Sequence, residues 1–317
     1  MNKKLKIVFA GTPKFAVPTL EIISNASFEI ICVLTQPDRK AGRGMKKIPS
    51  HVKNAANKLG LPIMQPQSLK SLEVFNAIKD LKADILVVAA YGLIIPEKIL
   101  NLFHKGCLNV HASLLPRWRG AAPIHRAIES GDNKIGVTIM KVVSKLDAGP
   151  MIRKISVDLL DQSTAGEMTD LMSLKGAELM AEVLEDIAKG NEIKFTTQDE
   201  TKVTYANKIN KIEGKLNLDD SPDKLVRKIK AFNPYPGITY IFRSKILKIW
   251  DAIPIHLSPI KNFSPGDLLS IEKKLIIVLN HGAIELFEVQ VEGANKISGK
   301  EFIKRYSLDN GDTRSDV

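Results

Sequence analysis

The first two thirds of the chain alternate between short apolar runs and stretches with helical spacing. Six runs predict strands (7–10, 29–35, 85–90, 108–110, 135–143 and 151–157), and three stretches predict helices (15–23, 68–82 and 165–189). The run 85–90 is apolar without interruption, which is typical of a parallel strand covered on both faces. Strands that alternate with helices indicate an α/β domain with a doubly wound, mostly parallel sheet. We place this domain at residues 1–189.

Three helix starts carry residues that favour an N-terminus. We expect Ser68 to cap the helix that runs to residue 82. Thr164 and Glu167 have the spacing of a capping box. Ser221 followed by Pro222 supplies a cap and a first-turn proline for a helix in the last third of the chain.

The pattern changes after a polar stretch at 190–207, which we interpret as a linker. Beyond the helix that follows Ser221, short apolar runs are separated by turn residues (239–242, 246–252, 275–279 and 284–291). Short strands between turn signals are typical of a small β-barrel. We therefore predict a smaller OB-like β-barrel domain at residues 208–317.

Composition narrows the class of protein. The chain has 317 residues, 44% hydrophobic and 26% charged, which is typical of globular domains. Cys32 and Cys107 form no CxxC pair, so we exclude a disulfide framework and a cysteine-rich zinc site and expect two buried apolar side chains. The apolar stretch 85–95 is too short to span a bilayer, and no signal-peptide pattern begins the chain. We expect a cytoplasmic protein without membrane association.

The turn after the first predicted strand lies where dinucleotide-binding proteins carry their glycine fingerprint. Here Gly11 is followed by Thr12 and Pro13, so the GxGxxG pattern is not met. We predict either a simple tight turn or a ligand-binding loop at the carboxyl end of a strand.

The net charge of +11 suggests an anionic partner such as a nucleic acid, a phosphorylated metabolite or a membrane surface, although a lysine-rich surface alone would also account for it. Five positive charges and no acid lie within residues 39–47. Gly42 and Gly44 make this segment flexible, and guanidinium groups suit phosphate contacts. The alternative is an ordinary solvated loop. We predict nucleic-acid contacts from four of its side chains: Arg39, Arg43, Lys46 and Lys47.

Asn109 and His111 form the most informative pattern. Side chains alternate along a strand, so these two residues point to the same side at the carboxyl end of a short predicted strand. An amide donor beside an imidazole could bind a developing oxyanion and move a proton. Asp147 lies in a turn between two later strands. It is either a turn-forming aspartate or, if the fold brings it to His111, the carboxylate that orients and charges the imidazole.

Taken together, these residues resemble the folate-dependent formyltransferases. The resemblance rests on Asn109 and His111, the run Ser113–Pro116, Asp147 with Gly149, and longer matches at 9–13, at 35–39 with 42–44, at 115–124, and at 231–234 with 236–237. It extends over nearly the whole chain. It is closest to those members of the family that act on methionyl initiator tRNA.

The resemblance implies transfer of a formyl group from 10-formyltetrahydrofolate to the α-amino group of methionine on initiator tRNA, a step in translation initiation that uses no metal. It implies that Asn109, His111 and Asp147 are catalytic. Contacts with the folate are implied for Ser113, Leu114, Leu115 and Pro116. The segment 39–47, with Arg43 the most informative position, and the C-terminal domain would bind tRNA. We expect a monomer.

Two other interpretations stay open. A related formyltransferase could act on a small amine, such as a purine precursor or an amino sugar. The basic segment 39–47 and the additional C-terminal domain argue against the purine enzyme. The architecture alone does not exclude an amino-sugar enzyme of the same length, so that choice depends on the basic segment. A non-catalytic RNA-binding protein would account for the charge but would leave Asn109, His111 and Asp147 without a role.

Overall fold

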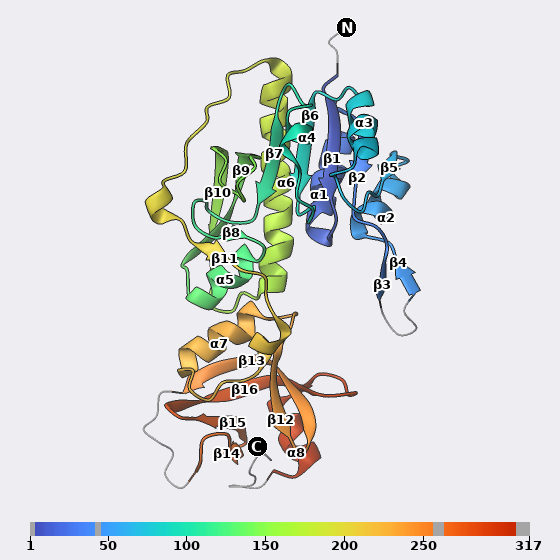
Figure 1. Ribbon diagram of the computed structural model, residues 1–317. Helices are drawn as coiled ribbons and strands as arrows, with labels where there is room; N and C mark the ends of the chain where they lie inside the picture. Colours follow the sequence, from blue (N-terminus) through green and yellow to red (C-terminus); the bar gives the residue numbers. More distant parts are fainter. Residues whose placement is uncertain (1–3, 42–45, 256–262, 309–317) are drawn as a thin grey trace. The chain divides into compact units, whose positions relative to one another are not determined.

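The computed structural model describes residues 4–41, 46–255 and 263–308. The chain divides into two compact units (Figure 1). The first contains Met1–Pro123, Lys134–Asp158 and Thr169–Ala206, and the second contains Ile124–Asn133, Leu159–Met168 and Asn207–Val317. Residues 190–206, within the stretch predicted as a linker, therefore belong to the first unit.

The first unit is built on a seven-stranded sheet in the order β10-β9-β7-β6-β1-β2-β5. Its strands are β1 (Lys6–Gly11), β2 (Glu29–Leu34), β5 (Ile63–Met64), β6 (Ile85–Ala89), β7 (Cys107–His111), β9 (Lys134–Lys141) and β10 (Met151–Asp158). All neighbours from β7 to β5 run parallel, and β9 and β10 are antiparallel. The strand order reverses its direction of growth at β1, because β2 lies on one side and β6 on the other. This confirms the predicted doubly wound, mostly parallel sheet.

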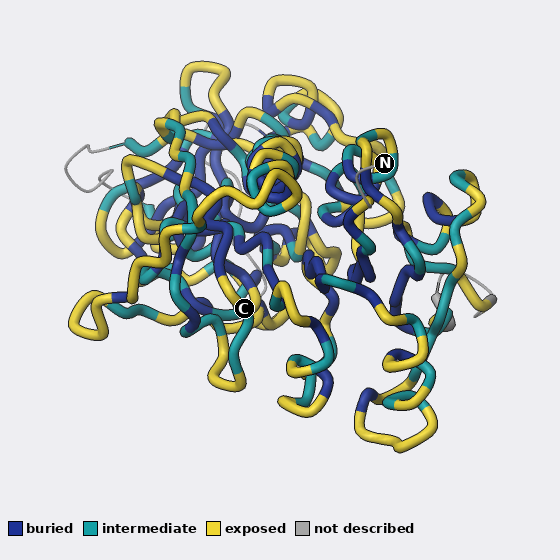
Figure 2. Tube along the Cα trace, turned by 90° about the horizontal axis from the view of Figure 1, so that it is seen from above, coloured by how far each residue is buried: buried dark blue, intermediate teal, exposed yellow. Residues whose placement is uncertain are grey.

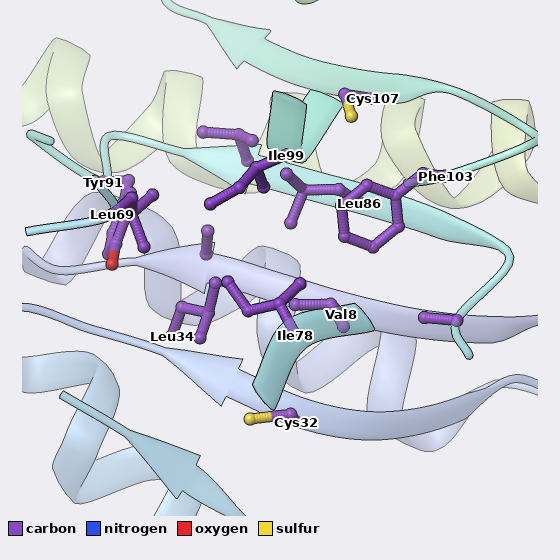
Figure 3. Close-up of a cluster of buried hydrophobic side chains, with 13 residues drawn as sticks. Val8, Cys32, Leu34, Leu69, Ile78, Leu86, Tyr91, Ile99, Phe103 and Cys107 are labelled. Carbon is purple, nitrogen blue, oxygen red and sulfur yellow. The ribbon is translucent and has the colours of Figure 1, made fainter. Parts of the chain in front are cut away.

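Helices cover both faces of this sheet. They are α1 (Val17–Asn25), α2 (His51–Lys58), α3 (Leu72–Asp80), α4 (Glu97–Leu100) and α6 (Ala165–Lys189), with the 3-10 turns η1 (Lys14–Ala16) and η2 (Glu200–Lys202). All of α5 (Pro123–Ser130) except Pro123 belongs to the second unit. Ile78 of α3 and Ile99 of α4 pack with Val8 and Leu86 on one face (Figure 3). On the other face, Gly176 of α6 lets the helix approach Val110, because a Cβ at Gly176 would lie 2.5 Å from Val110 Cγ1.

The buried cluster of Figure 3 also contains both cysteines. Cys32 and Cys107 are free thiols, and burial raises the pKa of Cys32 to about 11 and that of Cys107 to about 12. Both therefore behave as small apolar side chains, as predicted from the sequence. Buried positions follow the strands, whereas the connecting loops are mostly exposed (Figure 2).

Two short strand pairs accompany the main sheet. The hairpin β3 (Arg39–Ala41) and β4 (Lys46–Ile48) carries the ends of the basic segment. The parallel pair β8 (Arg119–Gly120) and β11 (Tyr205–Ala206) joins segments that are far apart in the sequence. Neither pair was predicted, because two or three residues carry no periodicity of their own.

The second unit contains a six-stranded antiparallel sheet in the order β12-β13-β16-β15-β14, with β17 paired to β16. Its elements are η3 (Lys211–Gly214), α7 (Pro222–Ala231), β12 (Ile238–Phe242), β13 (Lys245–Ile255), β14 (Leu268–Ile271), β15 (Lys274–Leu279), β16 (Gly282–Val291), β17 (Ile297–Ser298) and α8 (Gly299–Tyr306). This confirms the predicted small OB-like β domain. The sequence did not predict β14, β17 or α8. The rings of Phe302 and Tyr306 on α8 both meet the ring of Phe242 on β12 edge to face.

The predicted helix starts are confirmed in two of three cases. Thr164 and Glu167 bond each other's backbone N–H groups as a capping box, and Ser221 caps α7 with Pro222 in its first turn. The prediction for Ser68 is wrong, because Ser71 caps α3 by accepting a hydrogen bond from the N–H of Val74. Within the described residues, no helix has the length and apolar character needed to cross a bilayer.

Candidate active site

The site is centred on the carboxyl end of β7. Asn109 and His111 lie on the same face of the sheet, since they are two residues apart in a strand. Their register partners on β9 are Met140 and Thr138, which share that face. Asn109 is half-buried, and His111 is buried. The strand therefore presents an amide and an imidazole side by side, as the alternation of the sequence predicts.

Both ring nitrogens of His111 face other groups. Nε2 lies 2.9 Å from the carbonyl oxygen of Trp118. A carbonyl oxygen only accepts hydrogen bonds, so Nε2 carries a proton. Nδ1 lies 3.6 Å from Oδ2 of Asp147, which is longer than a hydrogen bond and within reach of a charge–charge interaction. The fold thus brings together His111 and Asp147, which the sequence separates by one helix and two strands.

Asp147 lies in the turn between β9 and β10 with a left-handed backbone (φ +46°). Its Oδ2 atom also accepts a hydrogen bond of 2.9 Å from the N–H of Gly120. A carboxylate that accepts one backbone hydrogen bond has further lone pairs available for a second donor. The same oxygen can therefore take a proton-bearing Nδ1 of His111 as its second partner.

The run Ser113–Pro116 folds back over the end of β7 and is fixed by Thr138. Thr138 Oγ1 donates to the carbonyl oxygen of Ser113 at 2.7 Å and accepts from the N–H of Leu115 at 3.2 Å. Nζ of Lys154 donates to the carbonyl oxygen of Leu115, and burial lowers the pKa of this lysine. The backbone of the run is therefore held before any ligand arrives.

The four side chains of this run are not equally accessible. Leu115 is fully buried with Met140, and the hydroxyl of Ser113 donates inward to the carbonyl oxygen of Arg117 at 2.6 Å. Leu114 and Pro116 are partly exposed. Side-chain contact with a ligand is thus available from Leu114 and Pro116, whereas Ser113 and Leu115 shape the loop.

A second group of polar contacts lies at the carboxyl ends of β1, β2 and β6. Thr12 Oγ1 and Gln36 Nε2 both donate to the carbonyl oxygen of Tyr91, at 2.8 and 2.9 Å. Gly92 follows with φ +79°, and a Cβ there would lie 2.3 Å from Gln36 Nε2. Glycine is therefore required for this approach. These contacts place Thr12 at the point where the strand order changes direction, the usual ligand position in such sheets.

The ends of the basic segment lie on the β3–β4 hairpin, which follows β2 and adjoins this second group through Arg39. Arg39 is exposed and donates to Oε1 of Gln36. Lys47 is exposed, Lys46 belongs to β4, and Arg43 lies outside the described residues. Next to the hairpin, Asp38 accepts hydrogen bonds from Gln65 and Lys53, which lower the pKa of its carboxyl group. Because Lys53 belongs to α2, its bond connects the segment after β2 to that helix.

Several residues that support the site were not predicted from the sequence. Thr138 was detectable as a hydroxyl within the apolar run 135–143. No sequence pattern marks Lys154 or Gln198, because each bonds a backbone carbonyl of a loop that is distant in the sequence: Leu115 for Lys154 and Asp147 for Gln198. Within the part of the chain that the structure describes, no three His, Cys, Asp or Glu side chains are grouped to hold a metal ion.

Comparison with known families covers both units of the chain. A family model described as formyl transferase matches residues 4–184, and one described as formyl transferase, C-terminal domain, matches residues 208–307. The chain belongs to the formyl transferase family. These matches confirm the resemblance to formyltransferases that the sequence motifs indicated, over residues 4–184 and 208–307 of this formyl transferase.

Individual relatives agree with this assignment. A methionyl-tRNA formyltransferase of Methylococcus capsulatus is 43% identical over 304 residues, which cover 96% of this chain and 98% of the relative. The formyl transferase also has the fold of an N-formyltransferase from Helicobacter canadensis, solved with folinic acid and dTDP-3-aminofucose (TM-score 0.65, 18% identity, 92% of this chain and 100% of the other). HypX from Aquifex aeolicus, solved with tetrahydrofolic acid, shares the fold at TM-score 0.61 and 14% identity. The superposed region covers 99% of this chain and 49% of the HypX chain.

Proposed function

We propose that this formyl transferase transfers the formyl group of 10-formyltetrahydrofolate to the α-amino group of methionine on initiator tRNA, and so supports translation initiation. The observation that carries the proposal is the 43% identity to a methionyl-tRNA formyltransferase over 304 residues, which include the C-terminal domain as well as Asn109, His111 and Asp147. Fold similarity alone does not distinguish this acceptor from an amino sugar, since WlaRD, a sugar 3N-formyl transferase, has the same fold.

We propose distinct roles for the three residues at the end of β7. When bound, 10-formyltetrahydrofolate supplies the carbonyl carbon that the neutral amine attacks. An α-amino group has a reference pKa of about 7.7–8.0, so a fraction of the methionyl amine is neutral near pH 7. The Asn109 amide donates to the oxygen that gains negative charge. The His111–Asp147 pair accepts the proton that the amine loses, at Nδ1 of His111. The bond between the formyl carbon and the folate nitrogen then breaks, and the proton passes through water to that leaving nitrogen.

This assignment modifies the sequence-based hypothesis for His111. That hypothesis has a protonated His111 donate to the oxyanion beside Asn109. In the structure Nε2–H is already bonded to the carbonyl oxygen of Trp118, and Nδ1 faces Asp147. Donation to the oxyanion requires that the Trp118 bond be given up, whereas Nδ1, at 3.6 Å from Asp147, has no hydrogen bond to that carboxylate to give up. We therefore favour the role in proton transfer.

The residues present suit a flat folate ring. Binding sites for such ligands are mostly apolar, carry few polar groups and are largely formed in advance. Leu114 and Pro116 offer apolar surface, and Thr138 fixes the backbone between them. We propose that these residues hold the folate, with the loop that contains Tyr91 and Gly92 as its neighbour.

We propose that tRNA is held by Arg39, Arg43, Lys46 and Lys47 of the basic segment and by the domain at residues 208–317. The catalytic domain then corresponds to the first unit, which extends to Ala206 rather than to the predicted end at residue 189. Phosphate contacts by such residues would make tRNA binding weaken as salt increases. We further propose that the enzyme works as a cytoplasmic monomer, which light scattering of the free protein would test.

The direct test is to incubate the purified protein with 10-formyltetrahydrofolate and methionyl initiator tRNA and to separate the product on an acid gel. We expect formyl-methionyl-tRNA from the wild type and almost none from His111→Ala. A folded, folate-binding protein that yields no product would contradict the proposal. An amino sugar would then be the next acceptor to test, in the same assay.

A further inference from the structure

The turn that carries Asp147 is held from outside by one buried amide. Gln198 lies between α6 and η2 and is 4% exposed. Its Nε2 atom donates to the carbonyl oxygen of Asp147 at 2.8 Å and to that of Gly149 at 2.7 Å. Two hydrogen bonds from one amide thus fix the peptide groups on both sides of the turn.

The orientation of this amide is set by Arg119. The Arg119 side chain is 0% exposed. Its Nε atom donates to Oε1 of Gln198 at 2.9 Å, and its Nη2 atom donates to Oε1 of Glu200 at 2.7 Å. A guanidinium group only donates hydrogen bonds. The Gln198 atom that faces it must therefore be the oxygen, which leaves the NH2 group for the two carbonyls of the turn.

The backbone of the turn at Gly149 packs closely against β9. A Cβ at Gly149 would lie 1.8 Å from the carbonyl oxygen of Lys141, so the backbone there is in close contact with β9. Asp147 itself has φ +46°, a conformation that non-glycine residues adopt only where their surroundings maintain it. Gln198 supplies part of that constraint, and the direction of the Asp147 carboxylate depends on it.

The same chain of contacts reaches His111 by a second route. Arg119 lies between Trp118, whose carbonyl accepts from His111, and Gly120, whose N–H donates to Asp147. The backbone N–H of Arg119 donates to the carbonyl of Thr204 at 2.9 Å, next to β11. The segment 198–206 therefore supports both partners of the His111–Asp147 pair.

We propose that Gln198 is a positioning residue for formyl transfer, and that Arg119 acts through it by fixing its amide. Gln198 contacts the backbone of the Asp147 turn, so it acts by setting where the Asp147 carboxylate lies relative to Nδ1 of His111. This inference rests on the proposed function. It adds to the reaction a residue from the segment that the sequence predicted as a linker.

The test compares Gln198→Glu with Gln198→Met. Glutamate keeps an oxygen for Arg119 but places a second oxygen against two carbonyls, whereas methionine removes both contacts at similar size. We expect each variant to lower kcat by at least about tenfold and to leave KM for 10-formyltetrahydrofolate within about twofold, since placement of a catalytic group is sensitive to small displacements. Gln162→Glu and Gln162→Met, at an exposed glutamine, are the matched controls.

A double-mutant cycle separates positioning from general support of the fold. If Gln198 acts through Asp147, Gln198→Glu introduced into Asp147→Asn changes kcat by less than about twofold, because residues that act as a unit are not additive. A purely structural glutamine would lower kcat by the same factor in both backgrounds. Additive losses therefore overturn the inference.

The remaining outcomes are also decisive. Folded Gln198 variants with wild-type kcat overturn the inference while leaving the proposed function intact. Failure of both variants to fold, judged by circular dichroism and thermal melting, also overturns it, since Gln198 is then a residue of the fold. Absence of formyl-methionyl-tRNA with the wild type contradicts the proposed function itself.

Discussion

Nε2 of His111 donates to the carbonyl oxygen of Trp118 at 2.9 Å. This single contact fixes which nitrogen of the ring can exchange a proton, because the carbonyl can only accept. Nδ1 is left facing Asp147 at 3.6 Å. The pair can therefore hold an added proton between an imidazole and a carboxylate, close to the amide of Asn109 on the same face of β7.

Replacement of Asn109 tests the stabilisation of the developing oxyanion. We expect Asn109→Ala to lower kcat by about 10²–10³-fold, the usual effect of removing one such donor, with little change in KM for either substrate. Steady-state kinetics of formyl-methionyl-tRNA formation measure this. Asn191→Ala, at an exposed asparagine near the end of α6, is the control. A fully active, folded Asn109→Ala would exclude the proposed role.

The charge of Asp147 is tested by Asp147→Asn. Asparagine keeps an oxygen that can accept from the N–H of Gly120, so the turn is retained, while the negative charge facing His111 is lost. We expect kcat to fall by at least about 10²-fold, the range of general acid–base effects. Folate binding, measured by fluorescence titration, should stay unchanged. Asp170→Asn removes an exposed carboxylate of α6 and should retain wild-type kcat.

The basic segment is tested by Arg39→Ala and Arg43→Ala. We expect each to raise KM for methionyl-tRNA and to leave KM for folate unchanged, because guanidinium groups contact phosphates. If one phosphate contact is lost, the slope of log K against log salt should decrease by about one. Lys134→Ala, an exposed cation on β9, serves as the control. Equal effects on both substrates would speak against a role in tRNA binding.

Asp220 provides a test of stability in the second unit. The carboxylate is 2% exposed and lies 2.7 Å from Nζ of Lys224 and 2.9 Å from Nζ of Lys228. Burial opposes its ionisation, but the hydrogen bonds and positive charges of the two lysines outweigh burial and lower its pKa. We expect Asp220→Asn to reduce the free energy of unfolding at pH 7 by about 1–3 kcal/mol.

The sign of the pH dependence follows from that lowered pKa. The folded carboxyl group titrates below the unfolded value of 3.8. Its contribution is therefore complete above that value and is lost as the pH falls through the folded pKa. Urea unfolding of wild type and Asp220→Asn, followed by the fluorescence of Trp118 and Trp250, should differ at pH 7, and the difference should shrink as the pH falls below 3.8. Asp251→Asn, at an exposed position, should match the wild type throughout.

Much of the fold follows from the sequence, because its signals are local. The apolar run 85–90 indicated β6, and Thr164 with Glu167 marked the start of α6. The pairing of β8 with β11 had no such signal, since each strand has two residues and their partners lie about 86 positions apart. Ser71 caps α3 in place of Ser68, whose hydroxyl instead accepts from the N–H of Lys70; both serines are possible caps in the sequence.

The sequence by itself determined the two domains, the side-by-side placement of Asn109 and His111, and the family to which the chain belongs, since these depend on periodicity and on motifs of adjacent residues. Only the tertiary structure decided that Asp147 reaches His111, that Nε2 of His111 is taken by Trp118, and that Gln198 holds the Asp147 turn from 51 positions away. The physical reason is that a strand fixes neighbours two residues apart by its own geometry, whereas a contact between loops depends on the path of the whole backbone.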